Sequence, residues 1–313
     1  MEDIKDPRTK MAAVIRELNK ILVGKDDIIH TVFCAMLAGG HVLLEDVPGV
    51  GKTTLALGIS SVLALKYKRV QFTPDVLPSD VTGFMMFNRK TNEFEYKEGA
   101  VMTNLLLADE INRTSSKTQS ALLEVMEERR TTVDSVTHEL PQPFFVLATE
   151  NPNGSAGTQK LPESQLDRFM VRISIGYPQL SDEVRIYQGQ QRSALASVQQ
   201  VLTADEFVQM QECADRVETS EAICEYLARL VKATRDHEMT ELGLSPRGGI
   251  AVLQMAKAKA YLDGRDYVIP EDIRDVWEAT AYHRILVDKR GKINGIGAKE
   301  ISEDVFQSVS LPE

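Results

Sequence analysis

The stretch from Asp46 to Thr54 constrains the fold of this chain most strongly, because it reads D-V-P-G-V-G-K-T-T. An apolar run, Val42–Leu44, precedes it, and a helix-like run over residues 55–65 follows it. A strand, a glycine-rich turn, Lys-Thr and a helix form the arrangement that holds a nucleoside triphosphate. The turn directs backbone N–H groups at phosphate oxygens, and the helix adds its N-terminal dipole. The stretch therefore predicts a nucleotide-binding α/β domain.

Two residues of this turn have specific predicted roles. Lys52 can reach the β- and γ-phosphates, and the hydroxyl of Thr53 is a candidate ligand of Mg²⁺. The usual pattern starts with glycine, whereas this chain has Asp46 at that position. The turn must then depend on the proline and glycines that follow. We predict nucleotide contacts along the whole stretch, at Pro48, Gly49, Val50, Gly51, Lys52, Thr53 and Thr54.

Length, charge and cysteine content limit the class of protein. The 313 residues allow one large domain or two ordinary ones, and the net charge of −10 argues against a nucleic-acid motor. The charged start Met1–Asp6 is unlike a signal peptide, and no apolar run is long enough to span a membrane. We therefore expect a cytoplasmic protein. Cys34, Cys213 and Cys224 have no close spacing, which predicts reduced thiols without a metal role.

Strand-like and helix-like segments alternate over the first part of the chain. The expected strands cover residues 41–45, 69–72, 105–108, 144–148 and 171–175. Several are apolar on both faces, as in a parallel sheet covered by helices. Two more segments read as hairpins, over residues 84–96 and 131–140. The first hairpin is apolar, and is either a contact surface or a covered edge of the same domain.

From about residue 181 the pattern is helical only. Its start signals include a capping box at Thr203–Glu206 and the pair Ser245-Pro246. We expect an α/β domain over residues 1–178 and a compact helical domain over 179–288. The glycine-rich tail, residues 289–313, is expected to be loosely ordered or to dock elsewhere.

Polar residues follow the predicted strands at their carboxyl ends, where open α/β sheets bind ligands. Asp109 closes one strand and is predicted to hold Mg²⁺, directly or through water. Glu110 stands beside it and can deprotonate a water aimed at the γ-phosphate. Asn151 ends the next strand, and its amide can bond both that water and a phosphate oxygen. The simpler alternatives are an acidic strand end and a turn-forming Asn before Pro152.

Two arginines complete the predicted chemistry. Arg168 precedes the last strand and cannot easily bend back to its own nucleotide, so it is a candidate arginine finger for a neighbouring subunit. The alternative is a salt bridge with Asp167 or Glu163. Arg247 lies in the first turn of a helix, where a cation opposes the helix dipole by about 0.3–1 kcal/mol. We therefore expect an anion such as a triphosphate beside it, the alternative being a snorkelling surface arginine.

Together these residues resemble an AAA+ ATPase of the MoxR type. The resemblance rests on Leu43–Thr53, Phe72–Gly83, Leu107–Arg113 and Leu161–Phe169, which follow the family's order. It covers residues 10 to 285 approximately and leaves the tail after Asp288 outside. It implies a P-loop AAA+ core with a parallel five-stranded sheet flanked by helices, followed by a smaller all-α lid domain.

The resemblance also implies roles for single residues. In this family Asp46 is an ordinary variant of the loop, and Val23 with Gly24 matches the segment that approaches the adenine. Asn151 matches the position called sensor 1, Arg168 matches the arginine finger, and Arg247 matches sensor 2.

The family further implies an assembly and a partner. Its members form ring-shaped hexamers with ATP and Mg²⁺ between subunits, and act as chaperone-like remodellers, often with proteins that carry a von Willebrand A domain. Residues 80–100 correspond to the helix-2 insert, and residues 131–140 to the hairpin before sensor 1. The chain departs from the family at Glu150, where glutamine is usual.

Three functions remain open at this point. The first is ATP-driven remodelling of a protein partner, which no residue identifies. The second is a nucleic-acid-dependent motor, for which Arg89 and Lys90 at the insert tip are the only hint. The third is a nucleotide-switched scaffold with little turnover, against which Glu110 and Arg168 argue.

Overall fold

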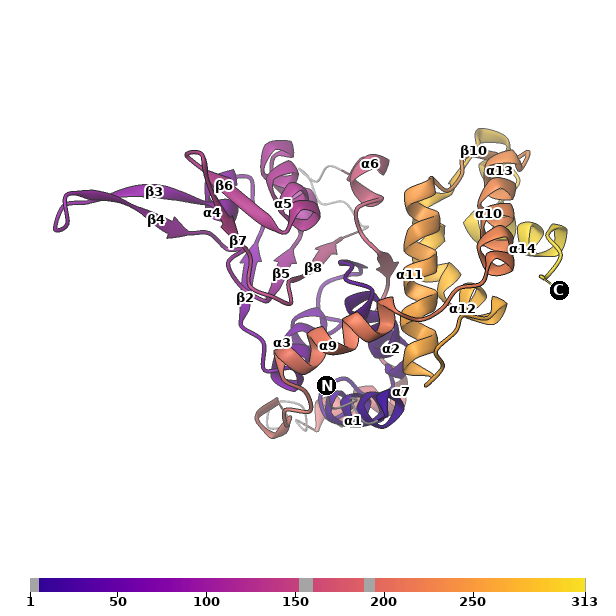
Figure 1. Cartoon of the computed structure of the whole chain (residues 1–313), viewed down its shortest axis with the longest axis horizontal. Coiled ribbons are helices and arrows are strands. Elements are labelled where there is room, and N and C mark those ends of the chain that lie inside the picture. Colours follow the sequence, from indigo (N-terminus) through magenta and orange to yellow (C-terminus); the bar gives the residue numbers. More distant parts are fainter. Residues whose placement is uncertain (1–5, 152–159, 189–194, 313) are drawn as a thin grey trace.

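A five-stranded parallel sheet forms the centre of the protein (Figure 1). The computed structural model describes residues 6–151, 160–188 and 195–312. The strand order is β2-β5-β8-β1-β9, and all neighbours are parallel. The strands are β1 (Val42–Glu45), β2 (Tyr67–Gln71), β5 (Leu105–Asp109), β8 (Phe145–Glu150) and β9 (Val171–Ile173). The predicted parallel five-stranded sheet is thus confirmed.

Helices cover both faces of this sheet because successive strand residues point to opposite sides. Leu105 and Leu107 of β5 pack into one core, whereas Leu106 and Ala108 pack into the other. The first core contains α1 (Pro7–Leu18), α2 (Asp26–Leu37) and α3 (Lys52–Val62). The second contains α4 (Pro78–Thr82) and α5 (Ser116–Glu128). A short 3-10 helix, η1 (Ile111–Arg113), links β5 to α5.

Both predicted hairpins form, and neither pairs with the central sheet. They consist of β3 (Gly83–Asn88) with β4 (Glu93–Glu98), and of β6 (Arg130–Val133) with β7 (Val136–Glu139). The β3–β4 hairpin extends away from the body (Figure 1). Near its tip, Phe87 and Phe94 meet edge to face and are 46% and 67% exposed. The alternative of a covered domain edge is therefore wrong.

The second half of the described chain is mainly helical. Its helices are α6 (Glu163–Leu166), α7 (Leu180–Tyr187), η2 (Leu195–Ser197), α9 (Ala204–Asp215), α10 (Glu221–Asp236), α11 (Pro246–Leu262), α12 (Pro270–Ala281) and η3 (Tyr282–Arg284). The predicted capping box at Thr203 and the Ser245 cap are both present. A small antiparallel pair, β10 (Thr240–Leu242) with β11 (Leu286–Val287), was not expected from the helical pattern. None of the helices in the described ranges has the length and apolarity needed to cross a membrane.

The described tail, residues 289–312, contains helices that dock on the rest of the molecule, so of the two expected alternatives loose order is wrong and docking is confirmed. It forms α13 (Lys289–Ile293) and α14 (Ala298–Ser308), and α14 packs on α10. Ile301 and Val305 are buried, and the Trp277 indole donates to Ser302 Oγ at 3.0 Å. The tail's glycines concealed this helical spacing of apolar residues.

Candidate functional site

The loop between β1 and α3 owes its shape to two glycines. Gly49 and Gly51 have φ angles of 92° and 105°, a region that side chains disfavour. A Cβ at Gly51 would lie 3.0 Å from the nearest Leu22 methyl, whereas Gly49 faces open space. Lys52 follows directly as the first residue of α3. The loop therefore exposes backbone at a helix N-terminus, which favours anions.

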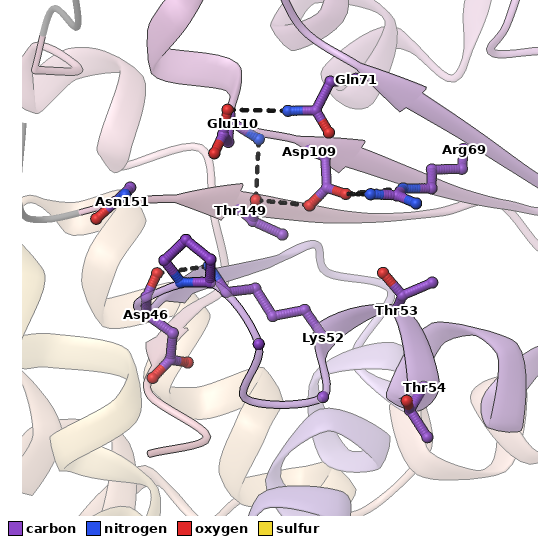
Figure 2. Close-up of a pocket in the computed structure, with 13 residues that line it drawn as sticks. Asp46, Lys52, Thr53, Thr54, Arg69, Gln71, Asp109, Glu110, Thr149 and Asn151 are labelled. Atoms are coloured by element: carbon purple, nitrogen blue, oxygen red, sulfur yellow. Dashed lines mark hydrogen bonds and ion pairs between the residues drawn. The ribbon is translucent and has the colours of Figure 1, made fainter. Parts of the chain in front are cut away.

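A cavity of about 320 Å³ lies between this loop and the carboxyl ends of β2, β5 and β8 (Figure 2). We call it the main cavity. It brings together most of the predicted residues, namely Pro48, Gly49, Gly51, Lys52, Thr53, Thr54, Asp109, Glu110 and Asn151. Arg69, Gln71 and Thr149 also line it, although the sequence patterns did not single them out.

Asp46 has a structural role that explains its place at the start of the loop. Its carboxylate accepts hydrogen bonds from Ser174 Oγ at 2.6 Å, Ile175 N at 2.7 Å and Gly176 N at 3.1 Å. Figure 2 shows this carboxylate pointing away from Asp109 and Glu110. The Asp46 side chain thus fastens the loop to the segment after β9.

Lys52 lies half-buried with its ammonium group against the loop. Its Nζ donates to the Asp46 carbonyl oxygen at 2.6 Å. Burial lowers the pKa of Lys52, while the charges of Asp46, Asp109 and Glu110 act in the opposite direction. Because burial disfavours the ammonium ion, an anionic phosphate beside it would be strongly favoured.

Asp109 is held by partners on two neighbouring strands. Its Oδ2 accepts from Arg69 Nε at 2.8 Å and lies 2.6 Å from Arg69 Nη2. Its Oδ1 accepts from Thr149 Oγ1 at 2.9 Å. The parallel register sets Asp109 opposite Gln71. Arg69 lies two residues before Gln71 and therefore projects from the same face of β2 as Gln71.

Glu110 has a backbone conformation that few side chains adopt. Its φ is 54°, and its N–H donates to Thr149 Oγ1 at 2.9 Å. The carboxylate accepts from Gln71 Nε2 at 2.9 Å and from Arg113 Nη1 at 2.8 Å. Such strained backbone persists where surrounding bonds over-determine it, as they do here. Glu110 is thereby directed into the main cavity.

The main cavity has the donor set that Mg²⁺ prefers. The Thr53 hydroxyl and Asp109 carboxylate both line it, and Mg²⁺ takes oxygen ligands from one or two carboxylates plus substrate phosphates. Within the described ranges, no cluster of three or more His, Cys, Asp or Glu side chains could hold a metal by itself. The residues therefore fit a metal that binds together with a nucleotide.

A smaller cavity of about 90 Å³ adjoins the loop and shares Gly49, Gly51 and Thr54 with the main one. Its walls are largely apolar and include Val23 and Val50, as expected for a surface that receives a flat base. Gly24 lies beside it with a φ of 71°, and a Cβ there would lie 2.6 Å from Asp182 Oδ2. The positive φ thus favours glycine next to this cavity.

The two predicted arginines lie together, but not in the main cavity. Arg168 and Arg247 line a third cavity of about 250 Å³, here called the arginine cavity. Glu127 of α5 contacts both, at 3.5 Å from Arg168 Nη1 and 3.1 Å from Arg247 Nη1. The carboxylate partner of Arg168 is therefore Glu127, rather than Asp167 or Glu163. The anion expected beside Arg247 is also Glu127 in the single subunit.

Glu150 is buried at the end of β8, next to Asn151. It lies opposite Glu45 in the parallel register. Burial, followed by the charge of Glu45, raises the pKa of Glu150. A glutamine at this position is uncharged and would avoid the unfavourable free energy of a buried carboxylate opposite Glu45.

Comparisons with known proteins agree with this geometry. Residues 41–171 match the ATPase family associated with various cellular activities (AAA), and residues 232–305 match the AAA lid domain. The chaperone MoxR1 of Mycobacterium tuberculosis is 37% identical over 96% of this chain and 81% of its own length. The chain belongs to the MoxR-type AAA+ ATPases. The AAA+ α/β core, the helical lid and ATP hydrolysis follow from this membership.

Two further proteins are similar to this chain over almost its whole length. YeaC of Bacillus subtilis, described as uncharacterized, is 45% identical over 96% of this chain and 95% of its own length. A solved structure of a candidate ATPase from Cytophaga hutchinsonii is 36% identical, with a TM-score of 0.91, and covers 98% of this chain and 96% of its own. Because the lid match continues past Asp288, the expectation that the tail lies outside the resemblance is wrong.

Four residues of this MoxR-type site were missed from the sequence. Arg69 and Gln71 are two positions apart on β2, so their side chains lie on one face of the strand, and this spacing could have indicated a shared role. Thr149 and Glu127 gave no signal, because only the strand register and helix packing bring them to their partners.

Proposed function

We propose that this chain is a Mg²⁺-dependent ATPase that acts in a ring-shaped hexamer as a chaperone-like remodeller or activator of a protein partner. The main observation behind the proposal is that two groups of charged side chains line different cavities of the chain. Lys52 and the acidic pair line the main cavity, whereas Arg168 and Arg247 line the arginine cavity. A second copy of the chain could supply these arginines to the nucleotide.

Within one subunit, the loop would hold ATP while the strand ends activate water. Lys52 and the loop N–H groups would neutralise the phosphates, and Thr53 with Asp109 would hold Mg²⁺. Glu110 accepts a proton from the attacking water, which Asn151 orients. The bonds of Glu110 to Gln71 and Arg113 must then give way to a bond with water. The bound Mg²⁺ would neutralise charge on the phosphates.

Between subunits, Arg168 would serve as the finger and Arg247 as the second sensor arginine, both on a neighbour's nucleotide. An arginine finger is worth about 10³-fold or more in rate. Both arginines already have an anion, Glu127, which a γ-phosphate would have to replace. The adenine would lie against Val23 and the chain at Gly24, in the smaller cavity.

A protein partner is favoured by the projecting β3–β4 hairpin. Its exposed Phe87 and Phe94 form an apolar patch near the tip, and the relative MoxR1 carries the name chaperone. We propose a partner with a von Willebrand A domain, as the family resemblance implies. Nucleic acid is disfavoured by the net charge of −10. A cytoplasmic location fits the three free cysteines.

We also propose the domain limits 1–178, 179–288 and 289–313. The limits are supported by the order of the elements, because the last central strand ends at Ile173 and the described elements after it are helices apart from β10 and β11. The tail would act as an extension of the lid, since α14 packs on α10.

The test of this function is Glu110→Gln, with Glu128→Gln as the matched control on the exposed end of α5. We expect Glu110→Gln to bind a fluorescent ATP analogue with unchanged affinity and to lose turnover, while Glu128→Gln keeps both. Near-normal hydrolysis by Glu110→Gln would refute the assignment of the base.

A further inference from the structure

Arg284 occupies a buried position between the segment after α6 and the helical lid. Its side chain is 4% exposed. Its Nε donates to Asp167 Oδ1 at 2.6 Å, and Nη2 donates to the carbonyl oxygens of Asp167 at 3.2 Å and Phe169 at 2.7 Å. Its Nη1 donates to the carbonyl oxygens of Met170, at 3.2 Å, and Thr280. All three guanidinium nitrogens therefore have acceptors, as a buried arginine requires.

Asp167 connects Arg284 to the start of α11. The second carboxylate oxygen of Asp167 accepts from Ser245 Oγ at 3.2 Å. Ser245 is the N-cap of α11, and its Oγ accepts from Gly248 N at 3.1 Å. One carboxylate thus joins the segment that carries Arg168 to the helix turn that carries Arg247.

Close packing supports the same connection. A Cβ at Gly248 would lie only 2.9 Å from Arg284 Cδ. The first turn of α11 therefore approaches Arg284 so closely that glycine is needed there. Asp167 immediately precedes Arg168, and Gly248 immediately follows Arg247. The buried network thus contacts the immediate neighbours of both arginines in the chain.

We propose that Arg284 is a positioning residue that clamps the Arg168 segment to the lid. Arg168 and Arg247, which come from different parts of the chain, then form one rigid receptor for the nucleotide of a second copy. The proposal rests on the proposed function, in which both arginines act on a neighbouring subunit. Arg284 itself lines the arginine cavity. Its guanidinium nitrogens already donate to Asp167 and to backbone carbonyl groups, so its proposed role is to hold the other two arginines in place rather than to bind the nucleotide.

The test compares Arg284→Lys with Arg290→Lys, a matched exposed arginine in α13 of the tail. A lysine at 284 keeps the charge, but its single nitrogen cannot serve Asp167 and the carbonyl groups of Phe169 and Met170 together. Because a misplacement of about 1 Å can cost about 10²-fold in rate, we expect kcat to fall about 10-fold or more. Binding of a fluorescent ATP analogue to the intact protein should change less than about 2-fold, and Arg290→Lys should match wild type.

A double-variant background separates positioning from general stability. In an Arg168→Ala/Arg247→Ala protein, Arg284→Lys should lower kcat no further, because the residues it positions are gone. Should Arg284→Lys fold poorly, Asp167→Asn breaks the same clamp more mildly and should give the same non-additive loss of kcat.

Three results would overturn the proposal. An additive loss of kcat in the double-variant background would assign Arg284 a general structural role. Normal kcat in both Arg284→Lys and Asp167→Asn would show that the clamp is not needed. Normal kcat in the Arg168→Ala/Arg247→Ala protein would instead refute the action of these arginines on a neighbour, and the positioning role would fall with it.

Discussion

Replacing Asp46 by glycine, the residue that most phosphate loops have at this position, should destabilise this chain. The Asp46 carboxylate accepts three hydrogen bonds from the segment after β9. The N–H of Ile175 is buried, and losing its acceptor costs about 1–3 kcal/mol. The donors of Ser174 and Gly176 are nearer to solvent, and each of their bonds contributes about 0.5–1.5 kcal/mol.

The expected total loss is about 2–6 kcal/mol, in which the two solvent-near donors contribute less because water can satisfy them. For a chain of 313 residues this corresponds to a fall of at least about 3 °C in the thermal unfolding midpoint. The assay is thermal unfolding followed by circular dichroism, with ATP-analogue binding measured in parallel. Asp46→Asn, which keeps one acceptor oxygen, should lose less. A midpoint of Asp46→Gly within about 1 °C of wild type would refute the fastening role.

Three further predictions concern the metal site, the buried glutamate and the hairpin. Arg69→Ala removes the cation that competes with Mg²⁺ for Asp109, so the Mg²⁺ affinity of the ATP complex should rise about 2- to 5-fold. This factor corresponds to the free energy of a half-exposed ion pair. Weaker Mg²⁺ binding, measured by calorimetry, would contradict the prediction. Burial and the charge of Glu45 raise the pKa of Glu150 above 4.5 in the folded protein. Just above pH 4.5 the folded protein therefore binds more protons than the unfolded one, and its stability falls as the pH rises through the pKa of folded Glu150. Glu150→Gln should therefore raise the unfolding midpoint at pH 8 and lose this advantage near pH 4; an equal gain at both pH values would argue against the titration. Phe87→Ser with Phe94→Ser should leave basal ATP hydrolysis unchanged and abolish partner-stimulated hydrolysis, because both rings are exposed at the hairpin tip; unchanged stimulation would exclude the tip as the contact.

The sequence was informative where a residue's role follows from its own element. Lys52, Asp109 and Asn151 stand at the end of a strand or the start of a helix, and those ends converge in any parallel sheet. The fold class followed from the alternation of strand-like and helix-like segments along the chain, so the parallel sheet and the helical second part could be predicted.

The sequence was less informative where a role depends on packing between distant elements. Arg69 meets Asp109 only through the register of β2 on β5, and Glu127 meets Arg168 and Arg247 only through the placement of α5. The role of Asp46 likewise depends on a segment about 130 residues away in the chain. Such pairings are set by tertiary structure and leave no local period to detect.

The most direct test of the central claim, that the site is completed by a second copy, is an activity measurement on mixed rings. Arg168→Ala and Glu110→Gln subunits carrying different tags would be coexpressed, and rings that contain both tags purified. Each variant alone should keep only a small residual rate, about 10³-fold or more below wild type for Arg168→Ala. Mixed rings should hydrolyse ATP at about one quarter of the wild-type rate, because a quarter of randomly formed interfaces combine an intact Glu110 with an intact Arg168. Mixed rings as inactive as either parent would contradict the claim.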